Sequence, residues 1–247
     1  MKRIAFVGVV VALAAVAALV AQNDVRADEG GVPANPTQAK PVGNGLELTV
    51  TVDLVGEEHQ AKPGGGGSCT DADQSGYADP FAGARSGGLT MKVNTSTFPS
   101  SVASGALSAL QRAGGAWNGV RGGYFSISGG STKTGPAQDG ESSIGWVKLV
   151  PRKVLAATWS WADASGRIVE ADVFYNNSHP WGILASCGGS SFDVQDIGTH
   201  ELGHTVGLSH FSDSGGQATM YPSAPAGEVR KNTLTSGDRA AFGVSLG

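Results

Sequence analysis

The stretch from His200 to His210 constrains this chain most strongly, and it reads H-E-L-G-H-T-V-G-L-S-H. His200 and His204 are four residues apart, so on an α-helix they lie on one face and can reach one metal ion. Gly207 can adopt the positive φ that ends a helix, and the following turn returns His210 as a third ligand. Three protein ligands that leave one position open are typical of a catalytic zinc site.

Glu201 follows the first histidine directly and is rotated off the face that the histidines share. We expect it beside the metal, where it would act as the general base for a zinc-bound water whose pKa falls to about 7. A bare H-E-x-x-H occurs by chance in ordinary helices. The motif extended to Gly207 and His210 and followed by Met220 is a much more specific sign of a metal site. Met220, in the sequence Met-Tyr-Pro, is predicted to form a turn beneath the metal.

The N-terminus has the pattern of a secretory signal peptide, residues 1–27. Two basic residues precede an uncharged apolar run, residues 4–21, and cleavage is expected near Ala27, or alternatively after Ala21. An uncleaved membrane anchor is the alternative, since a run of this length is marginally sufficient to span a bilayer. We expect a secreted protein that leaves the membrane after cleavage.

Residues 28–68 read as a leader or pro-segment that ends in a Gly-rich linker, ahead of a catalytic domain over residues 69–247. Alternating apolar residues from Leu46 to Leu54 predict one strand inside this leader. One strand cannot form a domain alone. It is therefore either a short pro-segment or a strand that adds to the main domain.

The two cysteines, Cys69 and Cys187, are predicted to form one disulfide, because an even count after a signal peptide suits an exported protein. Closing so long a loop would stabilise the fold by up to about 4–5 kcal/mol in the chain-entropy model. The alternative is that Cys69 is a free thiol that ligates the zinc and keeps the protein latent.

The periodicity of residues 69–247 predicts an α+β domain with a mixed twisted sheet. Strands are expected at residues 88–94, around Phe125 and Ile127, around Ile144 and Trp146, at 154–162 and at 168–176. Helices are expected from a serine cap near Pro99 to Trp117, after a cap at Asp193, and from Ser236 or Asp238 through Phe242.

The charge pattern excludes one class of partner. The formal net charge is −4, charged residues make up 15% of the chain, and no basic stripe is present. Nucleic-acid binding is therefore not expected.

We expect a monomer. Structural calcium is a further candidate cofactor beside the one catalytic zinc, in acidic loops such as residues 71–79.

With these residues in place, the chain resembles the metzincin zinc endopeptidases, and among them the matrixins, especially small secreted bacterial matrixin-like peptidases. The resemblance covers roughly residues 86–247. It implies a five-stranded twisted sheet, an active-site helix and a small irregular C-terminal subdomain after Gly207. It also implies a peptide substrate bound in extended form along an edge strand, with Tyr221 and Pro222 in the pocket wall.

The chain departs from the matrixin pattern at three points. Phe211 follows the third histidine, where matrixins usually carry serine, so the assignment to metzincins is firmer than the assignment to matrixins. No cysteine-switch pro-segment is visible. A second, structural zinc site needs more histidines than His59 and His179, which are predicted to be solvated.

The sequence thus predicts a secreted zinc-dependent endopeptidase. The alternatives are a non-catalytic secreted binding or adhesion protein that kept its metal site, a zinc hydrolase acting on cell-wall peptides, and a purely structural zinc protein. An intact Glu201 argues against the first, because that carboxylate has little use without catalysis. No wall-binding repeat supports the second. Loss of the fold on metal removal, with no substrate cut, would identify the third.

Overall fold

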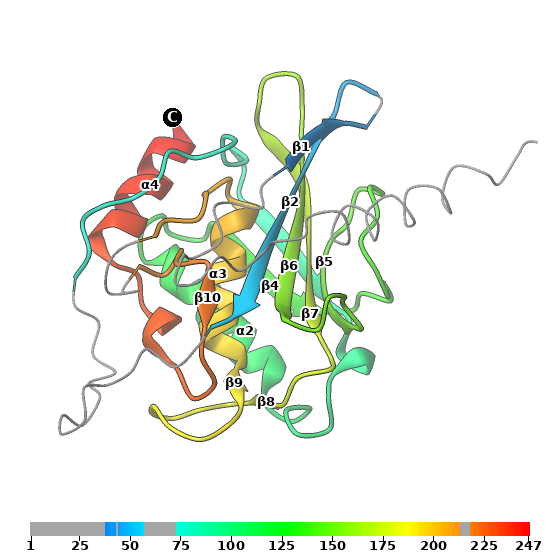
Figure 1. The fold of residues 1–247 in the computed structure, drawn as a ribbon. Helices are drawn as coiled ribbons and strands as arrows, with labels where there is room; N and C mark the ends of the chain where they lie inside the picture. Colours follow the sequence, from blue (N-terminus) through cyan, green and yellow to red (C-terminus); the bar gives the residue numbers. More distant parts are fainter. Residues whose placement is uncertain (1–37, 43, 57–72, 213–217) are drawn as a thin grey trace, which may run out of the picture.

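The computed structural model describes residues 38–42, 44–56, 73–212 and 218–247. Within these ranges a mixed sheet is backed by helices, and a further helix lies near the C-terminus (Figure 1). No helix of the described part is long and apolar enough to cross a membrane. The predicted signal peptide and the Gly-rich linker lie outside the described residues.

The strands of the main sheet are β1 (Gln38–Pro41), β2 (Glu47–Val55), β3 (Leu89–Val93), β4 (Phe125–Gly129), β5 (Ser142–Val147), β6 (Val154–Ala162), β7 (Ile168–Asn176) and β10 (Ser223–Ala224). Their order in space is β1-β2-β6-β7-β5-β3-β4, and β10 pairs with β2. β3 is parallel to β4 and β5, and β5 is parallel to β7. β6 is antiparallel to β7 and β2. The short strands β8 (Trp181–Gly182) and β9 (Phe192–Asp193) form a separate pair. The predicted α+β class with a mixed sheet is confirmed.

The sheet is larger than the predicted five strands. β3 to β7 are the five expected strands, and β2 extends the sheet beyond β6 by antiparallel pairing along most of its length. Val50 and Val52 of β2 are buried against Trp159 and Trp161 of β6. The strand predicted inside the leader therefore joins the main sheet. The sheet runs across the expected boundary after residue 68.

The described helices are α2 (Ala106–Asn118), α3 (Val194–Thr205) and α4 (Ser236–Leu246), with two 3-10 turns, η1 (Thr95–Thr97) and η2 (Arg230–Asn232). Asp193 caps α3 as predicted, because its side chain accepts a hydrogen bond from Asp196 N. The predicted start of α2 is wrong. The helix begins after Gly105 without a side-chain cap, and turns precede it. Val102 still points inward from those turns, which explains why it fitted the helical spacing.

α2 and α3 pack against each other and against one face of the sheet, around the larger of two hydrophobic clusters. Trp117 of α2 is fully buried, and its Nε1 donates a hydrogen bond to the Thr199 carbonyl of α3 at 2.8 Å. From the sheet, Ser160 Oγ of β6 donates a hydrogen bond to the His204 carbonyl of α3. α3 is thus hydrogen-bonded to α2 on one side and to β6 on the other, which fixes the backbone that carries His200 and His204.

Candidate metal centre

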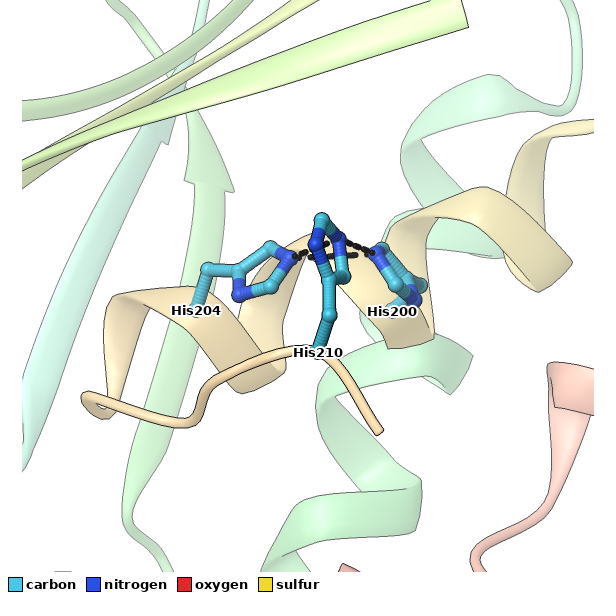
Figure 2. A group of neighbouring side chains, drawn as sticks. All are labelled: His200, His204 and His210. Atoms are coloured by element: carbon cyan, nitrogen blue, oxygen red, sulfur yellow. Dashed lines mark hydrogen bonds between the residues drawn. The ribbon is translucent and has the colours of Figure 1, made fainter. Parts of the chain in front are cut away.

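The local fold of residues 194–210 brings three histidines together (Figure 2). His200 and His204 lie one turn apart on α3. Gly207 has φ +88°, and Leu208 N donates to the Gly203 carbonyl at 3.0 Å, so the chain reverses as predicted. The reversal carries His210 back to the other two rings. All three side chains are buried.

The three imidazoles converge through one ring nitrogen each. The Nε2 atoms lie 3.0 Å apart for His200 and His204, 3.1 Å for His204 and His210, and 3.2 Å for His200 and His210. His200 Nδ1 lies 2.7 Å from the Thr219 carbonyl, and His204 Nδ1 lies 2.7 Å from the Leu208 carbonyl. A carbonyl only accepts, so both Nδ1 atoms carry the proton and both Nε2 atoms present lone pairs.

This arrangement fits a metal ion. Two Nε2 lone pairs at 3.0 Å repel each other unless a cation lies between them. Nitrogens at 2.0–2.1 Å from a tetrahedral zinc are about 3.3 Å apart, close to the observed separations. Burial lowers the pKa of His204 to about 4 and holds the pKa values of His200 and His210 well below their usual range. The imidazoles are therefore held in the neutral form that binds metals.

Glu201 lies between the two helical histidines in sequence and is also fully buried. Its Oε2 accepts a hydrogen bond from Thr158 Oγ of β6, and its Oε1 has no hydrogen-bond partner among the described residues. Burial raises its pKa well above the usual range, and the negative charge of Asp53 adds to that rise. A carboxylate with a raised pKa holds a proton more tightly than an exposed one.

Met220 packs against α3 at Gly203, the residue before His204. A methyl group at Gly203 would overlap with Met220 Sδ, so α3 and Met220 touch at a position that only glycine allows. The Met220 carbonyl accepts a hydrogen bond from Phe211 N at 2.9 Å, which ties the residue after the third histidine to this turn by its backbone. Tyr221 and Pro222 are buried in the next residues, directly before β10.

Two charged residues near the centre were missed by the sequence analysis. Asp53 of β2 is fully buried and lies in a group with His200 and Glu201 whose ligand atoms are all within 4.8 Å of one another. Lys231 of η2 is also buried, and its Nζ lies 3.9 Å from Asp53 Oδ1 and 3.5 Å from His200 Nδ1. Its backbone N donates to Asp196 of α3 at 2.7 Å, which places it. Neither residue belongs to a motif, so no local signal could have found them.

The other candidates from the sequence lie elsewhere or outside the described residues. Cys69 and His59 are among the latter, so the pairing of Cys69 with Cys187 stays a prediction. His179 is half-buried, and its Nε2 lies 3.0 Å from the Val154 carbonyl. Within the described part of the acidic stretch 71–79, no group of potential metal ligands is found, and calcium there stays a prediction.

The pKa shifts predict how the centre responds to acid. A lowered histidine pKa means that the neutral, metal-binding imidazole persists as pH falls, and that protons compete only near the lowered value. We expect zinc-loaded protein to keep its metal down to about pH 5.5 and to lose it near pH 4. The zinc-to-protein ratio after dialysis at each pH checks this. Half-loss near 6.5, the value of an ordinary histidine, would contradict it.

Comparison with known proteins also indicates a metalloprotease-like site. Residues 150–244, which include the three histidines, match the family model of the matrixins. A stretch of 60 residues is 40% identical to Metalloendoproteinase 1 of Glycine max. That stretch is 23% of this chain and 19% of the soybean protein, so the match spans about a fifth of the relative's length.

Proposed function

Because this chain is matrixin-like over residues 150–244, we propose that it is a zinc-dependent endopeptidase that hydrolyses peptide bonds. The observation that carries the proposal is the convergence of three buried Nε2 atoms within 3.2 Å of one another, with the carboxylate of Glu201 close by. His200, His204 and His210 would hold the metal. Three protein ligands would leave a position for substrate or water.

The chemistry divides between the metal and the protein. A bound zinc ion would polarise the scissile carbonyl and make a nearby water more acidic. Glu201 would accept the proton of the attacking water and pass it to the leaving amine. Thr158 holds one oxygen of Glu201 and leaves the other without a partner among the described residues, so one oxygen stays available for the proton. The carbonyls of Thr219 and Leu208 orient the rings of His200 and His204.

The substrate would bind in extended form. Among the five strands expected from the family resemblance, β6 lies at one edge. Its outer side pairs with an antiparallel strand, β2, in this structure. Backbone hydrogen bonds along such an edge bind many sequences, and side-chain pockets provide the selectivity. Residues 220–232, which include Tyr221 and Pro222, would line the pocket after the cut bond. The protein would act outside the cell as a monomer, after removal of residues 1–27.

A peptide-library digest tests this function and reports the side-chain preference together. Zinc-loaded protein should cut a restricted set of bonds, 1,10-phenanthroline should stop the cleavage, and added zinc should restore it. Cleavage that continues without the metal would contradict the proposal. So would zinc-loaded protein that cuts no peptide, either with its leader in place or after limited proteolysis has removed the leader.

A further inference from the structure

We propose that Asp53 is a ligand of the metal centre, and that β2 is an internal inhibitor which holds Asp53 there. The proposal rests on the proposed function, because it places β2 where an extended substrate would lie. It assigns a role to the leader, residues 28–68, for which the sequence left two alternatives.

The first support is the position of β2 between two elements that flank the centre (Figure 1). One edge of β2 is antiparallel to β6, from Glu47 opposite Ala162 to Leu54 opposite Val154. The other edge, near its C-terminal end, is parallel to β10. Leu54 N donates to the Pro222 carbonyl at 3.2 Å. β2 thus hydrogen-bonds to both the edge strand and the wall segment that a bound peptide would use.

The second support is the direction of the side chains of β2. Successive side chains of a strand point to opposite faces. Val50 and Val52 pack on the tryptophans of β6, on the face away from α3. Thr51 and Asp53 therefore point to the face of α3, and both are buried. Asp53 is the acidic residue that this face of β2 brings within 4.8 Å of both His200 and Glu201.

The third support is the incomplete pairing of the Asp53 carboxylate. Its Oδ1 accepts a hydrogen bond from Leu54 N at 3.0 Å and forms an ion pair with Lys231 Nζ at 3.9 Å, a separation too long for a hydrogen bond. Lys231 Nζ donates instead to the Tyr221 carbonyl at 2.7 Å. Asp53 Oδ2 has no hydrogen-bond partner in the described part of the chain although it is fully buried. A buried carboxylate oxygen without a partner is costly, and a bound cation would compensate for it.

These three observations have one consequence for activity. A carboxylate bound to the metal would fill the position that the three histidines leave open, and β2 would cover the edge of β6 that a substrate needs. The chain would then be latent until β2 leaves. Any change that weakens the bond between Asp53 and the metal should free the open position, even with β2 still paired.

The test uses the full chain loaded with cobalt(II), whose visible absorption depends on its ligands and their geometry. The native protein is compared with Asp53→Asn and with Thr51→Val, a matched control on the same face of β2 that removes a hydroxyl and no carboxylate. Asp53→Ser serves as a second variant if the asparagine protein does not fold. Each protein is titrated with acetohydroxamate, a small chelator that needs open positions on the metal.

We expect an altered cobalt spectrum and at least tenfold tighter acetohydroxamate binding in the Asp53 variant, and neither change in Thr51→Val. Identical spectra and affinities in the native and Asp53→Asn proteins would overturn the proposal. Peptide cleavage by the same samples separates the two ideas. Tighter chelator binding without any cleavage, even after limited proteolysis has removed the leader with β2, would leave Asp53 as a ligand and refute the endopeptidase. Equal cleavage by the native and Asp53→Asn proteins, with unchanged spectra, would support the endopeptidase and refute Asp53 as a ligand.

Discussion

Replacement of Glu201 by glutamine is expected to lower the rate of peptide hydrolysis by about 10²–10⁴-fold, the usual contribution of a general base. Glutamine has the shape of glutamate but cannot accept the proton of the attacking water. Its amide can still pair with Thr158, so the buried site should keep its packing. The three histidines are untouched, and the metal content should stay the same.

The measurement compares initial rates on one peptide with the zinc content of the same samples, for the native chain and again in the Asp53→Asn chain. Both chains are measured again after limited proteolysis has removed the leader, which shows the effect even if β2 covers the substrate edge. Glu141→Gln is a matched control, because Glu141 lies just before β5 and pairs with Ser131 Oγ, away from the metal centre. A Glu201→Gln protein that retains zinc and full activity would refute the proposed role of this residue.

Replacement of Gly207 by alanine is expected to destabilise the fold by about 2–4 kcal/mol and to weaken metal binding. Gly207 has φ +88°, a conformation that costs other residues about 1–2 kcal/mol. An added Cβ would also overlap with the Ala82 carbonyl, which is backbone and cannot rotate away. The turn would have to shift, and it carries His210 into the centre, so the third ligand would be displaced.

Gly115→Ala is the matched control for this substitution. Gly115 is exposed in the middle of α2, and an added Cβ meets no atom within 4 Å. Alanine there should stabilise the fold by about 1 kcal/mol, because glycine is a poor helix former. Urea unfolding of both variants gives the two free energies, and zinc titration gives the affinities. A Gly207→Ala protein as stable as the native chain, with unchanged zinc affinity, would contradict the account of this turn.

Much of the metal centre was predictable, because its signals are local in sequence. The helical spacing of His200 and His204 and the reversal at Gly207 need only the geometry of one helix and one turn. The bounds predicted for β6 and β7 agree with the structure for the same reason, since a run rich in apolar, aromatic and β-branched residues is visible without its partner strands. The start of α2 was predicted wrongly, because Val102 is buried from a turn and imitates the helical spacing.

The sequence by itself determined the three histidines, the glutamate between them, the turn that joins them and the α+β class. Each of these follows from the spacing of neighbouring residues. Only the tertiary structure decided that β2 pairs with β6 and β10, and that Asp53 and Lys231 meet at the centre. Alternation along β2 shows that its side chains divide between two faces, but not which sheet receives the strand. That choice depends on contacts between residues far apart in the chain, which no local pattern records.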